Sequence, residues 1–234
     1  LRLISSGEHR QTPFIVYENV FSIGLDEHLA GAGQKDADFI LKVAMTASRG
    51  LRAAAAAGIN HRDIKPANLF LYAPDGRVKV TNFGLSSDPS IGPEGTSTLR
   101  GTPSYMAPEL VVAAHSIDHR ADMYSLGVTL YEAATGQLPF VKSTLLETMR
   151  AHVYDTPCAL LDLRPSFPRG LAATIERLLS KRPDERFPDW AELVATFESI
   201  RCESENPISE AVTRAVKGVS GTASLASIYR KNNT

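Results

Sequence analysis

The chain has 234 residues, which suits one large domain or two small ones, and its 43% hydrophobic and 22% charged residues exclude a fully disordered protein. Its 25 basic and 26 acidic residues nearly cancel, so charge gives no support for wholesale binding to nucleic acid or to a membrane surface. Two cysteines, Cys158 and Cys202, are too few for a disulfide framework and favour a reducing, intracellular location, which we expect to be the cytoplasm. No apolar run approaches the ~20 residues of a membrane span, and no signal peptide opens the sequence.

The N-terminal part of the chain is predicted to contain short strands followed by a long helix. The strand and turn patterns lie at residues 1–5, 7–12 and 14–17. A short helix is predicted over residues 25–30, and a long one over residues 36–57, where apolar side chains recur with a helical period and Gly58 ends the pattern. Residue 1 is Leu and not Met, which suggests that the sequence is a piece of a longer protein.

The rest of the chain is predicted to be mainly helical, with one small β-hairpin. Residues 69–72 and 77–81 are the strands of that hairpin, and the polar segment 82–101 is expected to be an exposed loop. Residues 122–134 are apolar on nearly every side, as expected for a helix buried among other helices. Further helices are predicted over residues 145–153, 170–180 and 189–200, and the polar stretch 201–234 is typical of a tail or linker that can be disordered.

The segment HRDIKPAN, residues 61–68, places three kinds of chemistry on one loop before a strand. Asp63 is a carboxylate that can accept or orient a hydroxyl proton, Lys65 is a cation for a phosphate, and Asn68 is a neutral oxygen ligand for Mg²⁺. Phosphoryl transfer needs this set, because its catalysis consists mainly of positioning and charge neutralisation. Taken alone, the octet fits an ordinary polar turn between a helix and a strand equally well.

The octet does not stand alone, because five further motifs follow it in order. They are Asn82-Phe83-Gly84, residues 101–106, Ala107-Pro108-Glu109, residues 122–127 and Arg186. The octet resembles the catalytic loop H-R-D-x-x-x-x-N of protein kinases. The five later motifs resemble, in order, the D-F-G motif, the peptide-positioning loop, the A-P-E motif, the buried central helix and the arginine partner of A-P-E in the same family. The resemblance runs from residue 1 to about residue 200 and implies an α+β, protein-kinase-like fold. Residues 1–20 would then be remnant small-lobe strands with the hinge, and residues 21–200 the mainly helical large lobe.

The resemblance assigns catalytic roles to this loop and its neighbours. Asp63 would accept or orient the substrate hydroxyl, Lys65 would contact the γ-phosphate of ATP, and Asn68 and Asn82 would hold Mg²⁺. Thr102 would hydrogen-bond Asp63 and Lys65 and select hydroxyl substrates. Lys65 two positions after Asp63 is the pattern of the Ser/Thr-specific members, so the expected partner is a protein with Ser or Thr acceptors.

The resemblance also implies a nucleotide site near the start of the chain. Tyr17 would be the gatekeeper, the backbone groups of Glu18 and Val20 would bind adenine, and Phe70 would form the floor under the purine. Ordinary core packing of Tyr17 and Phe70 is the alternative.

Other family positions imply structural roles. His61 and Phe83 would belong to a hydrophobic stack anchored at Asp122, and Glu109 and Arg186 would form a buried ion pair.

A short hydroxyl-rich run lies before the peptide-positioning loop. Thr96, Ser97 and Thr98 stand where activating phosphorylation occurs in relatives, and Arg62 would be the partner of such a phosphate. An unmodified hydrophilic loop is the alternative.

The sequence departs from the family pattern in two places. Asn82 stands for the D-F-G aspartate and removes a full negative charge from a site for a hard cation, so metal affinity should fall sharply. No G-x-G-x-x-G loop and no V-A-I-K lysine precede the hinge, so half of the nucleotide pocket would be open to water. We therefore expect that this polypeptide alone does not transfer phosphate at a useful rate.

The leading hypothesis is ATP-dependent transfer of the γ-phosphoryl group to Ser or Thr hydroxyls of proteins, weakened by Asn82 and not self-sufficient in this chain. The alternative is a pseudokinase that acts as a binding or scaffold domain. A third possibility is an incomplete fragment of an ordinary kinase. The sequence indicates no nucleic-acid partner and no membrane segment, and it does not indicate an oligomeric state.

Overall fold

The computed structural model describes residues 3–10, 12–18, 22–30, 34–72, 75–83, 101–112 and 117–205. The chain divides into two units, Leu1–Phe197 and Glu198–Thr234. Among the described residues, all elements lie in the first unit except the end of the last helix, α8 (Trp190–Glu205), which crosses the boundary. No helix in these ranges is long and apolar enough to cross a membrane.

The first two strands form an antiparallel hairpin. Strand β1 (Leu3–His9) pairs with β2 (Thr12–Tyr17), and the register places Gly7 opposite Phe14. The predicted turn over residues 7–12 is wrong, because both strands run further and Arg10 turns the chain with a left-handed φ of 51°. Gly7 lies in the strand opposite Phe14, where a Cβ would come within 2.8 Å of the end of the Phe14 ring.

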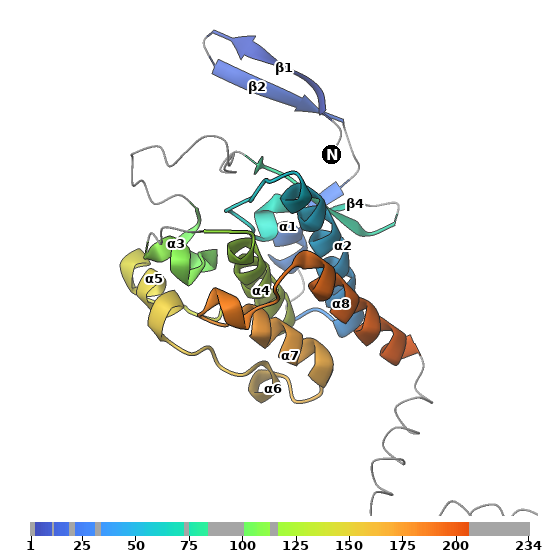
Figure 1. The fold of residues 1–234 in the computed structure, drawn as a ribbon, viewed down its shortest axis with the longest axis vertical. Helices are drawn as coiled ribbons and strands as arrows, with labels where there is room; N and C mark the ends of the chain where they lie inside the picture. Colours follow the sequence, from blue (N-terminus) through green and yellow to red (C-terminus); the bar gives the residue numbers. More distant parts are fainter. Residues whose placement is uncertain are drawn as a thin grey trace, which may run out of the picture. The chain divides into compact units, whose positions relative to one another are not determined.

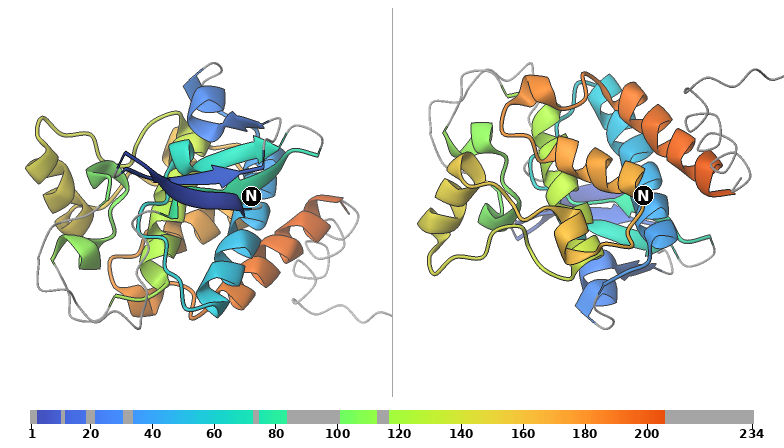
Figure 2. Two further views of the ribbon diagram at one scale, coloured as in Figure 1. Left: turned by 90° about the horizontal axis from the view of Figure 1, so that it is seen from above. Right: turned by 90° about the horizontal axis from the view of Figure 1, so that it is seen from below.

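A second, three-stranded antiparallel sheet contains the predicted hairpin. Its order is β3 (Ser22–Gly24), β4 (Leu69–Tyr72) and β5 (Arg77–Val80). The hairpin of β4 and β5 is confirmed, with Gly76 in the turn at a φ of 64°. Strand β3 was not expected, since three residues show no alternation that a pattern could reveal. The sheet lies against α2 (Ala37–Ala56), as both views of Figure 2 show.

The predicted long helix is confirmed as α2. Asp36 caps it by accepting a hydrogen bond from the backbone N–H of Phe39 at 2.7 Å, and its apolar face, which includes Ile40 and Val43, is buried. Before it lies α1 (Leu25–Ala30), also as predicted.

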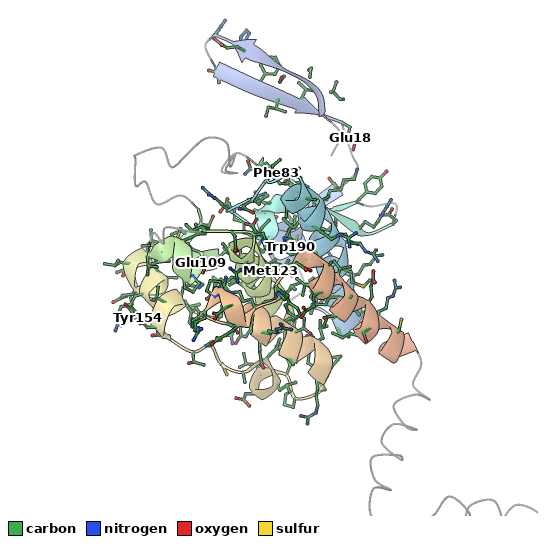
Figure 3. All side chains as sticks on the ribbon, viewed as in Figure 1. Glu18, Phe83, Glu109, Met123, Tyr154 and Trp190 are labelled. Carbon is green, nitrogen blue, oxygen red and sulfur yellow. The ribbon has the colours of Figure 1, made fainter. Side chains whose placement is uncertain are left out.

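The predicted buried helix is α4 (Arg120–Thr135), which is enclosed by other elements on nearly every side. It contacts α2, α3 (Pro108–Val111), α6 (Leu160–Leu163) and α7 (Arg169–Leu178), and Figure 1 shows it in the middle of the helices. Met123 in its first turn has no exposed surface (Figure 3 labels it). Gly127 lets α7 approach closely, because a Cβ there would lie 2.7 Å from the Cβ of Leu178. Gly136 ends the helix at a φ of 75°.

The three later helices that were predicted, α5 (Leu145–Tyr154), α7 and α8, are present with shifted ends, whereas the short helices α3 and α6 were not predicted. Helix α5 begins with a capping box between Thr144 and Glu147, and Tyr154 at its end is exposed (Figure 3). Helix α8 runs five residues past the predicted end at residue 200, so residues 201–205 are helical and not tail. The rest of the predicted tail, residues 206–234, lies outside the described residues.

Candidate active site

The candidate site is held by one carboxylate on the buried helix α4. Asp122 accepts hydrogen bonds from the backbone N–H groups of His61 at 2.6 Å and Arg62 at 2.7 Å. These two hydrogen bonds fix the loop that precedes η1 (Pro66–Asn68). They also hold Arg62 at a left-handed φ of 66°. The loop geometry is therefore fixed by the core of the fold.

Three predicted site residues, Lys65, Asn68 and Thr102, meet around the carboxylate of a fourth, Asp63. Oδ1 of Asp63 accepts from the backbone N–H of Thr102 at 3.0 Å and from its hydroxyl at 2.8 Å. On the other oxygen, Oδ2, Asp63 contacts Lys65 Nζ at 3.0 Å and Asn68 Nδ2 at 3.1 Å. Lys65 Nζ also donates to the Thr102 hydroxyl at 2.6 Å. Three hydrogen bonds and the ion pair with Lys65 therefore hold the carboxylate in place.

These contacts set the charge of Asp63. Burial acts to raise the pKa of Asp63, but hydrogen bonds from Thr102, Lys65 and Asn68 and the positive charge of Lys65 outweigh it and lower the pKa below its ordinary value. The carboxylate is thus ionised at neutral pH. A carboxylate with a lowered pKa is a weak base, so it is better suited to orienting a hydroxyl than to removing its proton early.

Gly101 lets the loop of residues 101–106 come close to this cluster. Its φ is 127°, and a Cβ there would lie 3.2 Å from the carbonyl oxygen of Arg62. The adjacent η3 helix (Pro103–Tyr105) continues the loop toward α3. The contact between residues 101–102 and 62–63 therefore joins two motifs that are far apart in the sequence.

Asn82 lies beside Asn68 on the same cluster. Its Nδ2 donates to Asn68 Oδ1 at 3.2 Å, and its own φ is 63°, a left-handed value that Asn tolerates. The two residues expected to hold Mg²⁺ are therefore neighbours. Their donor set does not fit Mg²⁺, because both side chains are neutral amides and one amide oxygen already accepts a hydrogen bond from the other amide. Within the described ranges, no group of three or more His, Cys, Asp and Glu side chains could hold a metal ion.

The predicted hydrophobic stack is present. The rings of His61 and Phe83 have centroids 4.6 Å apart, and His61 Nε2 lies 2.8 Å from the carbonyl oxygen of Thr81 (Figure 3 labels Phe83). A carbonyl only accepts, so Nε2 carries the proton. His61 thus ties the loop at its backbone to α4 and at its ring to the segment after β5.

The predicted ion pair between Glu109 and Arg186 is also present and is buried. Arg186 Nη1 and Nη2 donate to the two carboxylate oxygens of Glu109 at 2.6 and 2.9 Å. The other donors of the guanidinium reach carbonyl oxygens of Arg120, Ser180 and Lys181. All five donors are satisfied, which a buried arginine requires.

The predicted adenine site is described only in part. The Glu18 carboxylate pairs with Lys79 Nζ at 3.0 Å, and Phe70 on β4 is half-buried in register between Gly24 and Lys79. Val20 lies outside the described residues, as do the side chain of Tyr17 and the candidate phosphorylation sites Thr96, Ser97 and Thr98. Arg62, the expected partner of such a phosphate, has a buried Nε with no hydrogen-bond partner in the part of the chain that is described.

A cavity that the sequence did not indicate opens beside Lys65. It has a volume of about 640 Å³, and its lining includes Asp26, Ala67, Tyr105 and Glu132. The Tyr105 hydroxyl donates to Glu132 at 2.7 Å, and burial raises the pKa of Glu132 although this bond opposes the rise. The acidic Glu132, near the end of the largely apolar α4, is a signal in the sequence that could have pointed to it.

Known proteins resemble this chain over most of its length. A family model described as the protein kinase domain matches residues 1–196. The serine/threonine-protein kinase PksC of Streptomyces coelicolor is 35% identical over 184 residues, which cover 76% of this chain and 33% of that protein. PknA of Mycobacterium tuberculosis is 32% identical over 203 residues, or 86% of this chain and 46% of that protein. The chain therefore spans about a third to a half of these relatives.

A solved structure shows the same architecture. The crystal structure of a double mutant of the Mycobacterium tuberculosis PknI kinase domain superposes with a TM-score of 0.65 at 27% identity, covering 85% of this chain and 70% of that one. Its fold agrees with the predicted α+β kinase architecture, and the matched family and the named relatives agree with the motifs on the loop. The chain belongs to the protein kinase family, and within it resembles the Ser/Thr protein kinases.

Proposed function

We propose that this chain carries the phosphoacceptor side of a Ser/Thr protein kinase site, with slow transfer of the terminal phosphoryl group of ATP. The protein kinase family generally uses ATP and Mg²⁺. The observation that carries the proposal is the cluster of Asp63, Lys65, Asn68 and Thr102, in which each polar contact is 3.1 Å or shorter. Phosphoryl transfer depends on positioning and charge neutralisation, and both are built into this cluster.

The proposed roles follow from the donors and acceptors. Asp63 orients an incoming hydroxyl, and Thr102 holds Asp63 in place through two hydrogen bonds. Lys65 has three N–H donors, of which two contact Asp63 and Thr102 among the described residues. The third is suited to an oxygen of the transferred phosphoryl group. The acceptor is a Ser or Thr of a protein, since the Thr102 contact brings the peptide-positioning loop against the carboxylate.

Two further elements of the proposal concern regulation and location. Phosphorylation at Thr96, Ser97 or Thr98 would add a dianion that an arginine can bind, and the buried Nε of Arg62, which has no partner among the described residues, is the proposed donor. An intracellular location agrees with Cys158 and Cys202, which are both free and exposed thiols.

The experiment is a transfer assay with labelled ATP, Mg²⁺ and a panel of Ser- and Thr-containing peptides. We expect slow transfer that disappears in Asp63→Ala and rises in Asn82→Asp. Gln137→Glu is the charge-matched control, because it adds one negative charge on an exposed side chain after α4. Transfer that persists in Asp63→Ala would contradict the proposal.

A pseudokinase is the second candidate, and the Asn82–Asn68 hydrogen bond is the observation that favours it. If wild type binds ATP but neither it nor Asn82→Asp transfers phosphate, the chain is a nucleotide-binding or scaffold domain. Thermal unfolding with ATP measures the binding, since a ligand that binds only the folded state raises the unfolding midpoint whether or not it reacts, and the transfer assay then distinguishes the two candidates.

A further inference from the structure

The orientations of the two amides at the site follow from their surroundings. Asn68 Nδ2 donates to the carbonyl oxygen of Asp63 at 2.7 Å and to its carboxylate at 3.1 Å, and neither partner can donate in return. The Asn68 amide therefore cannot be turned over, and its Oδ1 faces Asn82. The atom of Asn82 that lies 3.2 Å from that oxygen must in turn be Nδ2. One carboxylate thus fixes both amides.

This chain of bonds shows what Asn82 contributes. A carboxylate in its place would bring a second oxygen to the oxygen of Asn68, with no proton between them, and only a cation could satisfy both. Asn82 supplies an N–H at that point instead. The pair is therefore satisfied by itself, and a divalent ion entering here would have to break the hydrogen bond and would gain only neutral ligands.

The net charge of the cluster also favours a triphosphate without a cation. Among the side chains of the cluster, Asp63 carries one negative charge and Lys65 one positive charge, while Asn68, Asn82 and Thr102 are neutral, so the sum is zero. An anionic triphosphate therefore meets no net repulsion from these groups. It meets N–H donors, namely the ammonium of Lys65 and the second N–H of the Asn82 amide.

We infer that this site binds a nucleoside triphosphate without a divalent cation, and that the amide of Asn82 takes the place of the cation bridge. The inference rests on the nucleotide site of the proposed function, but it does not depend on whether phosphoryl transfer follows.

The test measures the unfolding midpoint of the chain with ATP, either in EDTA or in excess Mg²⁺, for wild type, Asn82→Asp and the control Gln137→Glu. Wild type and control should be stabilised in EDTA at least as much as in Mg²⁺, because Mg²⁺ converts the free nucleotide into a form that the neutral amides do not favour. Asn82→Asp should be stabilised only when Mg²⁺ is present, with apparent affinities in the two conditions that differ by ~10-fold or more.

The outcomes separate the inference from the proposed function. If wild type is stabilised by ATP only in Mg²⁺, the inference is overturned and the nucleotide site stands. If ATP stabilises neither wild type nor variant in any condition, both are overturned. Should Asn82→Asp fail to fold, Asn82→Ala serves in its place. It removes the N–H without adding charge, and it should weaken binding in EDTA; unchanged binding would overturn the inference.

Discussion

Arg186 and Glu109 form a bidentate ion pair across 77 residues of chain, with the arginine 1% exposed and the glutamate 8% exposed. The pair joins α3, which follows the loop of residues 101–106, to the segment before α8. Since each partner is buried, neither can be removed without leaving the other charge unpaired.

Glu109→Ala should therefore destabilise the protein by ~3–5 kcal/mol, measured as the free energy of unfolding in urea. The matched control is Asp184→Ala, which breaks the exposed pair of Arg182 and Asp184 and should leave the unfolding midpoint near that of wild type. If both substitutions change the free energy of unfolding equally, the buried pair contributes no more to stability than the exposed one, and the prediction is wrong.

Removal of the Thr102 hydroxyl should raise the pKa of Asp63. Thr102→Val deletes the 2.8 Å hydrogen bond from the hydroxyl to the carboxylate, and it also removes one of the two oxygens that Lys65 contacts. The acidic limb of the pH–rate profile should move to higher pH, and transfer should fall by ~10²-fold. Thr102→Ser keeps a hydroxyl and should restore both the profile and most of the rate. A profile of Thr102→Val that does not move would argue that the hydroxyl does not act through Asp63.

The buried His152 should make stability depend on acid pH. Its Nε2 lies 3.0 Å from the carbonyl oxygen of Ser104, so Nε2 carries the proton, and Nδ1 accepts from the Tyr124 hydroxyl at 2.9 Å. Burial, aided by the charge of Lys181, lowers the pKa of His152 from 6.5 to about 4.

Stability depends on pH in this way because the folded protein holds His152 in its neutral form. Between pH 6.5 and about 4 the unfolded chain binds a proton at His152 that the folded chain does not, so stability falls as the pH falls through this window. The slope from this group approaches 1.4 kcal/mol per pH unit. Lys181, with a pKa lowered by burial to about 8, stays charged throughout and adds nothing to the slope. His152→Gln should reduce the slope in urea denaturation series, and an unaltered slope would show that other groups cause it.

Two glycines inside helices should respond differently to alanine. Gly127→Ala places a Cβ 2.7 Å from the Cβ of Leu178 and 3.3 Å from its backbone carbon, so α4 and α7 must separate, at a cost of about 1–3 kcal/mol. Gly50→Ala in α2 meets only a methyl group of Val80 at 3.3 Å, and the higher helix propensity of alanine, about 1 kcal/mol, should offset that contact. Thermal unfolding of the two variants tests this, and a Gly127→Ala protein as stable as Gly50→Ala would contradict the close approach.

The long elements of this fold could be predicted because their patterns repeat. Helix α2 shows a helical apolar period, and α4 is apolar on nearly every side, so both were predicted nearly to their ends. Strand β3 and the helices α3 and α6 have three or four residues each, which is too short for any period to show. Their conformation depends on neighbours that are distant in the sequence.

The site was predictable to the level of residue type, but not to the level of hydrogen bonds. The motifs identified Asp63, Lys65, Asn68 and Thr102, and the fold brings them together. No pattern shows that Asn82 donates to Asn68, because the direction of that bond is set by Asp63. The pairing of Tyr105 with Glu132 was missed for the same reason, since it needs η3 to be folded against α4.

The attachment of the 61–63 loop to Asp122 has a consequence for dynamics. Asp122 is 3% exposed within a helix whose neighbours all contribute to the core, so the amides of His61 and Arg62 can be released only when that core opens. Their hydrogen exchange should then be as slow as that of the α4 backbone, even though they sit in a loop. The working geometry of the site would persist until the whole helical region melts, and would vanish with it.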